Sequence, residues 1–264
     1  MTTRRQIKRK VGLAIVAIAI LSFPQSIVAE KQSNALELIN LAGQQRMLSQ
    51  RISKDYLYKG GEIAVSKAER QLNRTLKESL QAHSKLKDSI TDPKIINLLG
   101  FVEMNNQDIV LKTKESFTID NAQYVLDLSE SMLEGNEFVM SSLKKSSGLD
   151  ASKLIDMSAR QAMLSQRIAK YYIAYQLGIK DKNTINQMNK AVKLFADSHK
   201  ALLANQTNTP EINGKLKKID RLWGVVYKFY LDIETGGLPL IVFNTTDDIT
   251  KKMDEVTALY VKIK

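Results

Sequence analysis

The sequence predicts an all-α protein that consists of two tandem antiparallel four-helix bundles behind an N-terminal export segment. Apolar residues recur at intervals of three and four along nearly the whole chain, and there are only four prolines and twelve glycines in 264 residues. A nineteen-residue phrase at positions 39–57, INLAGQQRMLSQRISKDYL, returns at 155–173 as IDMSARQAMLSQRIAKYYI with ten identities. A repeat of this length indicates two copies of one unit.

Other residues repeat at nearly the same offset. The two histidines, His83 and His199, are 116 residues apart, and Pro93 and Pro210 are 117 apart. Each proline follows an Asp or a Thr, and proline after such a capping residue marks the start of a helix. The repeat therefore covers most of the chain.

Breaks at glycine, proline and asparagine divide each unit into four helices. The expected helices are 33–58, 62–89, 93–117 and 121–145 in the first unit, and 150–177, 182–204, 210–234 and 239–263 in the second. Helices of about 25 residues are about 38 Å long at 1.5 Å per residue, which suits an up-and-down bundle. We expect domains at 30–147 and 148–264, joined at Ser146-Ser147-Gly148.

Residues 1–29 have the layout of a secretory signal. Five cations precede an apolar run at 11–23, and small residues end at Ala29, after which we expect cleavage. The alternative is an uncleaved inner-membrane anchor at 11–29, but its apolar run of 13 residues is shorter than the roughly 20 that span a membrane. The sequence favours export to the periplasm of a bacterium.

Composition excludes several classes of function. The chain has no cysteine, so it has neither disulfides nor thiolate metal sites. Without the five signal-segment cations, 34 lysines and arginines face 28 acids, and the net charge falls from +11 to +6. Because the cations alternate with acids along the chain, they indicate solvated helix faces and not a nucleic-acid interface.

Arg46 is the most suggestive residue of the repeated phrase. Helical projection places Leu38, Leu48 and Ile52 on a bundle-core stripe, and Arg46 on a second strip of small and apolar residues that includes Ile39 and Ala42. We expect this strip to form a helix interface in which Arg46 meets an anion. A solvent-directed Arg46 is the alternative.

The phrase resembles the ligand-sensing motif of the PilJ/NarX-like family, the periplasmic module of type IV pilus chemotaxis transducers and nitrate/nitrite sensor kinases. In nitrate-sensing members the resemblance implies a small anion held at a dimer interface by the first arginine of the motif from each of two first helices. Carried over, that residue is Arg46, with Gly43 allowing close backbone approach and Arg51 as the second arginine. Arg51 projects about 140° from Arg46, so its direct contact with the same anion stays open.

The second copy departs from this pattern. Ala162 and Ala159 stand at the positions of Arg46 and Gly43, while Arg167 matches Arg51 and Arg160 is additional. If the two first helices of one chain paired, only one key arginine would face the anion. We therefore expect a homodimer through the first bundle with the anion at Arg46. Arg160 and Arg167 are weaker candidates for ligand contact in a second copy that is mainly structural.

Other residues indicate packing. His83 and His199 lack partners at metal-ligand spacing, so we assign no metal and no cofactor. Trp223, Tyr227 and Tyr230 form an aromatic ridge that we expect in the core. No catalytic motif is present, and we expect no enzyme.

The sequence thus predicts a periplasmic sensory module for a small anion, with nitrate and nitrite as the first ligands to test. Because the chain ends at Lys264 without a second membrane span, we expect a membrane sensor or transporter as its partner. The alternative is a structural or assembly protein of the envelope, related to pili or secretion, that binds no small molecule.

Overall fold

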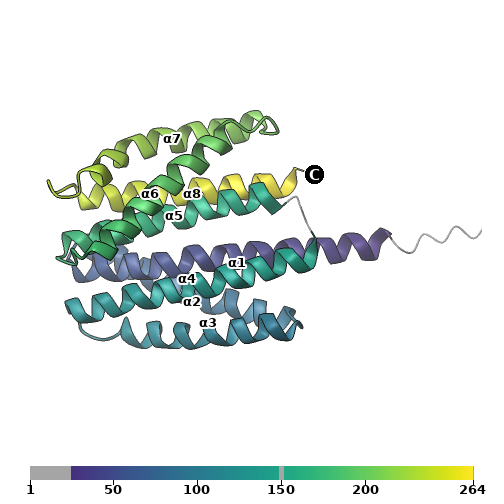
Figure 1. Ribbon diagram of the computed structural model, residues 1–264, viewed down its shortest axis with the longest axis horizontal. Helices are drawn as coiled ribbons and strands as arrows, with labels where there is room; N and C mark the ends of the chain where they lie inside the picture. Colours follow the sequence, from purple (N-terminus) through teal and green to yellow (C-terminus); the bar gives the residue numbers. More distant parts are fainter. Residues whose placement is uncertain (1–24, 149–151, 264) are drawn as a thin grey trace, which may run out of the picture.

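The computed structural model describes residues 25–148 and 152–263, and all regular structure within them is helical. The eight helices are α1 (Gln25–Gly60), α2 (Val65–Ser89), α3 (Pro93–Lys112), α4 (Ile119–Ser147), α5 (Ser152–Gln176), α6 (Lys182–Leu203), α7 (Pro210–Leu231) and α8 (Pro239–Lys262). They confirm the predicted all-α fold class (Figure 1).

Local chemistry sets the helix ends much as expected. The Asp92 carboxylate accepts from the backbone N–H of Lys94 at 2.8 Å, and the Thr209 hydroxyl accepts from that of Ile212 at 3.3 Å, so both predicted proline starts are capped. Gly178, two residues after the end of α5, has a φ of 103°, a backbone conformation that residues with a side chain rarely adopt. The third helix of each unit is shorter than predicted, because α3 ends at Lys112 and α7 at Leu231.

The helices pack as two groups of four. In the first group α1 packs on α2 and α4, and α3 completes the ring; in the second group α5 packs on α6 and α8, and α7 completes it. The largest packing between the groups joins α1 to α5, the first helices of the two units (Figure 1). We refer to α1–α4 and α5–α8 as the first and second units.

Helices α1 and α5 run side by side, parallel and in register. A Cβ atom at Gly43 would lie 3.4 Å from Ala159 Cβ, and one at Gly61 would lie 2.6 Å from Leu177 Cδ2. Both pairs are 116 residues apart, so equivalent residues of the repeat meet at both ends of the helix pair. An approximate twofold axis therefore relates the two units, with α1 and α5 next to it.

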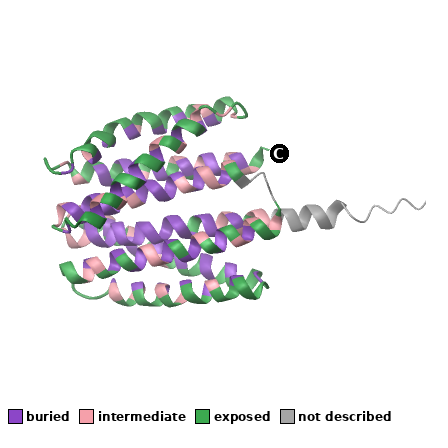
Figure 2. Ribbon diagram, viewed as in Figure 1, coloured by how far each residue is buried: buried purple, intermediate pink, exposed green. Residues whose placement is uncertain are grey.

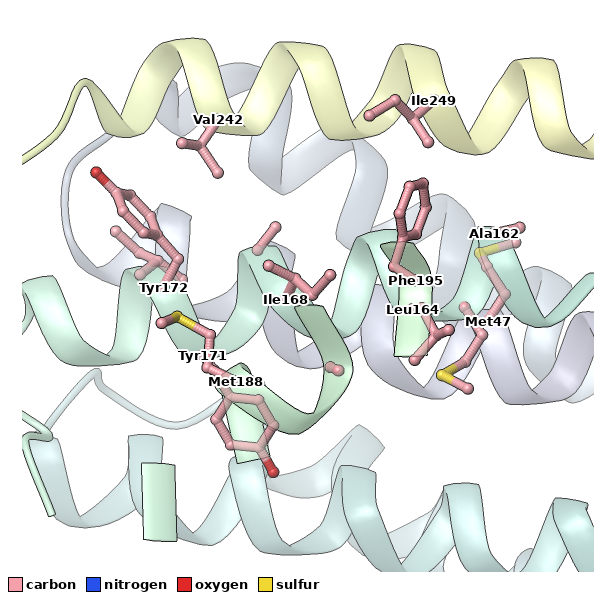
Figure 3. Close-up of a cluster of buried hydrophobic side chains, with 14 of the residues drawn as sticks. Met47, Ala162, Leu164, Ile168, Tyr171, Tyr172, Met188, Phe195, Val242 and Ile249 are labelled. Atoms are coloured by element: carbon pink, nitrogen blue, oxygen red, sulfur yellow. The ribbon is translucent and has the colours of Figure 1, made fainter. Parts of the chain in front are cut away.

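Burial is concentrated on the two central helices (Figure 2). One hydrophobic cluster crosses from the first unit into the second, and includes Met47 of α1, Ile168 of α5 and Phe195 of α6 (Figure 3). A smaller cluster lies within the first unit and contains Ile39 and Ala42. Because this core is continuous across the boundary, the two units are packed against each other and are not separate domains joined only by a linker.

Residues 1–24 of the expected signal segment lie outside the described residues. Residues 25–29 form the first turns of α1, so the expected cleavage site after Ala29 falls within this helix. Among the helices described here, none is both long and apolar enough to cross a membrane.

Candidate functional site at the boundary between the units

Two lysines of the repeated phrase are buried at the boundary between the units. Lys54 of α1 and Lys170 of α5 are 116 residues apart, and each has an exposed fraction of 0%. Lys54 Nζ donates to Asp247 Oδ1 of α8 at 2.6 Å, and Lys170 Nζ donates to Glu130 Oε1 of α4 at 2.5 Å. Each lysine thus crosses to the fourth helix of the other unit, and the two ion pairs are related by the approximate twofold axis.

The charges of these pairs stabilise each other. Burial alone would raise the pKa of Glu130, but Lys170 and Arg167 outweigh it and hold the pKa at about 2. Burial lowers the pKa of Lys170 to about 8 despite the neighbouring Glu130 carboxylate. Burial likewise opposes ionisation of Asp247, yet Lys54 and Arg51 keep its pKa well below the usual range. Both carboxylates are therefore ionised at neutral pH.

Asp55 is a third carboxylate, buried next to the ion pair of Lys54 and Asp247, and its pKa is shifted in the opposite direction. Asp55 has an exposed fraction of 0%, and its Oδ1 atom lies 3.2 Å from Lys54 Nζ. Burial raises the pKa of Asp55 to about 6, and the nearby Asp247 carboxylate adds to this increase, although Lys54 opposes it. The matched residue of the second unit is Tyr171, so only the first unit has this extra acid.

Arg46 lies where α1, α4 and α5 meet. It is fully buried, and its Nη1 and Nη2 atoms donate to Glu137 of α4 at 3.0 Å and to Asp156 of α5 at 2.7 Å. Burial opposes ionisation of Asp156, but Arg46 and Lys144 lower its pKa. Arg46 thus lies in a helix interface, and its partners there are two carboxylates of its own chain.

The surroundings of Arg46 differ from the predicted strip in one respect. Ile39 and Ala42, which we assigned to a helix interface outside the bundle, lie in the core of the first unit. Gly43 is the α1 residue that faces Ala159 of α5. Within one chain, α5 therefore occupies the side of α1 that we expected a second chain to cover.

The other motif arginines line two grooves, one in each unit. A groove of about 690 Å³ runs along α5 between α4 and α6 and is lined by Arg160 and Arg167. A groove of about 440 Å³ runs along α1 between α2 and α8 and is lined by Arg51. The two grooves are equivalent under the repeat, and each is bounded by helices from both units.

The two arginines of the second copy are paired within the chain. Arg160 Nη2 donates to Glu137 Oε2 at 3.2 Å. Arg167 grips Glu130 through Nε and Nη2 and also donates to Gln187 Oε1 at 3.0 Å. Arg51 has no corresponding hydrogen bond or ion pair among the described residues, and its Nε atom is buried without an acceptor.

The histidines and aromatic residues are packing residues. His83 and His199 are buried, and burial lowers the pKa of each. Trp223 stacks on Phe195 with ring centroids 4.2 Å apart, and Tyr230 is 2% exposed. Tyr227, which we expected in the same core, is 36% exposed. The described residues contain no group of three or more potential metal-ligating His, Cys, Asp or Glu side chains.

The sequence analysis did not predict that Lys54 and Lys170 are buried, because charged side chains normally lie on solvent-exposed faces of helices. The available signal was the lysine that both copies of the phrase retain, at 54 and 170. Their partners, Glu130 and Asp247, are 117 residues apart and differ in residue type, so the repeat at 116 does not align them.

The fold and the contacts between the two units define the class of protein: a helical-bundle module whose two related units are paired through their first helices. The family model described as type IV pili methyl-accepting chemotaxis transducer N-term (PilJ) matches residues 27–100 and 145–235. The match covers more than half of the chain, so the chain belongs to this family, whose members are helical sensory domains related to chemotaxis transducers. Its two segments agree with two tandem copies. Comparisons with curated proteins and with solved structures found no match.

Proposed function

We propose that the chain is an envelope sensory module that binds a small anion at the boundary between its two units and acts through a membrane partner. The observation that carries this proposal is the pair of grooves along α1 and α5, each bounded by helices from both units and each lined by a motif arginine. A ligand in either groove would contact both units, so its binding energy would depend on how they are arranged.

Arg46 is not the residue that the geometry favours for the anion. Both of its terminal amino groups already donate to carboxylates, so nitrate or nitrite at this position would have to displace Glu137 or Asp156. The homodimer that we expected from the sequence would also require α1 to release α5. Nitrate and nitrite stay in the ligand panel as the inorganic anions that the family resemblance suggests.

The location and the partner belong to the same proposal. The layout of residues 1–29 supports export, and a sensory module in the envelope needs a membrane protein, such as a sensor or transporter, to carry its signal inward. A ligand-dependent change at the α1/α5 boundary is what such a partner would recognise.

Thermal unfolding of the exported chain against nitrate, nitrite, sulfate, acetate and hexanoate, with chloride at equal ionic strength as the control, tests the proposal. A ligand at 100 times its Kd adds about 2.7 kcal/mol, which raises the Tm by roughly 5–10 °C for a protein of this size. If no anion changes the Tm, a structural or assembly role in the envelope replaces the sensory one.

A further inference from the structure

We propose that the groove along α1, between α2 and α8, binds an organic carboxylate whose carboxylate group is held by Arg51. This inference rests on the proposed function and specifies its site and ligand class. Arg51 has an exposed fraction of 9%, its Nε atom is buried without an acceptor, and the guanidinium has no ion pair within the described part of the chain. A buried N–H without an acceptor is costly, and an incoming carboxylate would accept a hydrogen bond from the Arg51 Nε atom and relieve that cost.

The second unit shows what the same arginine binds when a partner is present. Arg167, which is 116 residues from Arg51, binds the Glu130 carboxylate through two nitrogen atoms, the planar geometry that guanidinium and carboxylate groups prefer. Glu130 therefore serves as an internal model of the ligand. The second-unit groove is occupied at this point by its own side chain, and the first-unit groove is not.

The counterpart of Glu130 does not satisfy Arg51. At this position, 117 residues from Glu130, α8 carries Asp247, whose side chain is one methylene shorter. Asp247 instead accepts from Lys54 at 2.6 Å and from Gln71 at 2.7 Å. In the second unit the residue equivalent to Gln71, Gln187, accepts from the arginine. The glutamine thus supports the carboxylate in one unit and the arginine in the other.

The charges of the groove suit an anion better in the first unit than in the second. Arg51, Arg74 and Lys85 line the first-unit groove together with two carboxylates, Glu78 and Asp254, so its cations are in excess. The helix that walls the second-unit groove, α4, has Glu134 where α8 has Lys251, and Asp127 where α8 has Asn244. An added carboxylate would therefore meet less repulsion beside Arg51 than beside Arg167.

The size of the groove suits an organic anion. Its volume is about 440 Å³, and Leu41, which is partly exposed, lines it beside the cations. A groove of this size accommodates a small organic molecule, whose apolar body would contact Leu41 while its carboxylate group binds Arg51. A bound molecule would bridge α2 of the first unit and α8 of the second.

The probe for this site is hexanoate, with hexanol and nitrate as controls, in NMR titrations of the full chain that follow the Arg51 Nε–H resonance. Hexanoate should saturate the shift of this resonance, and hexanol and nitrate should bind at least about tenfold more weakly. Because Arg51→Met lacks this resonance, its affinity is measured by calorimetric titration, and the affinity for hexanoate should fall at least about tenfold. In the control Arg221→Met, at an exposed position of α7 outside both grooves, the affinity should not change.

A second variant tests the same site without removing the arginine. Asp247→Glu gives α8 the carboxylate length that Glu130 provides in the second unit. It should reach Arg51, shift the Nε–H resonance in the absence of ligand, and weaken hexanoate binding at least about tenfold.

Hexanoate binding that survives both Arg51→Met and Asp247→Glu, or failure of hexanoate to bind, would overturn this inference. If another anion of the panel still raises the Tm of the chain in that case, the sensory function stands and only the assignment of Arg51 and of the ligand class fails. A response to nitrate alone, with no response to hexanoate, would likewise overturn the organic-carboxylate assignment.

Discussion

Lys54 and Lys170 occupy the same position in the two copies of the repeat, and each forms a buried ion pair with the fourth helix of the opposite unit. The exchange is reciprocal: α1 reaches α8, and α5 reaches α4. Packing between α1 and α5 alone could tolerate sliding of one helix along the other. The two crossed ion pairs fix the register, because a shift would leave buried charges without partners.

Removal of one buried lysine should therefore be costly. Lys170→Met leaves Glu130 with one cationic partner, and we expect a loss of about 3–5 kcal/mol in the free energy of unfolding, as for other broken buried pairs. Urea unfolding at pH 7 measures it. Lys193→Met, which removes an exposed pair with Asp197, is the control and should leave the midpoint unchanged. Equal midpoints for the two variants would show that the crossed pair does not stabilise the fold.

Glu130 should make the fold sensitive to acid. Its pKa is about 2 in the folded chain and 4.5 ordinarily, so its contribution is present above pH 4.5 and is lost as the pH falls toward 2. This contribution is about 3 kcal/mol at neutral pH. Urea unfolding between pH 5 and pH 2.5 should show a smaller decrease in stability for Glu130→Gln than for the unaltered chain. Parallel decreases would mean that Glu130 does not titrate in this range.

Asp55 should make the stability of the fold depend on pH in the opposite direction to Glu130. Because its pKa is raised from 3.8 to about 6, ionisation costs stability as the pH rises through this interval. Asp55→Asn should therefore stabilise the fold by about 1–3 kcal/mol at pH 8 and have little effect at pH 4. Asp108→Asn, at an exposed position of α3, provides the control for general charge effects. A variant that is less stable at both pH values would mean that the Asp55 carboxylate is needed in its charged form.

Gly43 tests how closely α1 and α5 approach. A Cβ atom there would lie 3.4 Å from Ala159 Cβ, which is an ordinary contact, and the second unit has alanine at this position. Gly43→Ala should stabilise the chain by about 0.5–1 kcal/mol through helix propensity. Gly43→Leu should cost about 1–3 kcal/mol through overpacking. Thermal or urea unfolding of the two variants measures whether each change stabilises or destabilises the fold. If Gly43→Ala destabilises it, α1 and α5 approach each other more closely than described here.

The fold could be predicted from the sequence because its determinants are local. The helical period, the capped prolines at 93 and 210, and the glycine at 178 are each recognised within a few residues. They locate the eight described helices, although the ends of α3 and α7 differ from the prediction. The repeat added the division into two related units, since identical phrases fold into equivalent helices.

The site could be predicted only in part, because it depends on which helices meet. The phrase identified Arg46 as an interface residue, but not that Glu137 and Asp156 would satisfy it within one chain. Arg167 pairs with Glu130, whereas Arg51 does not pair with the equivalent Asp247, which lies on α8 more than 190 residues from Arg51 in sequence. Such a difference has no local signature.

Within one chain, α1 and α5 pair with each other, parallel and in register. The chain has no cysteine, so the double variant Gly43→Cys/Ala159→Cys places a single pair of thiols at this contact, with Cβ atoms close to the separation found in disulfides. Oxidation at low protein concentration, followed by non-reducing electrophoresis and mass spectrometry, should give an internally cross-linked monomer, and the Gly43→Cys single variant should not. Disulfide-linked dimers of the double variant, without the internal bond, would contradict the claim and favour pairing of first helices between two chains.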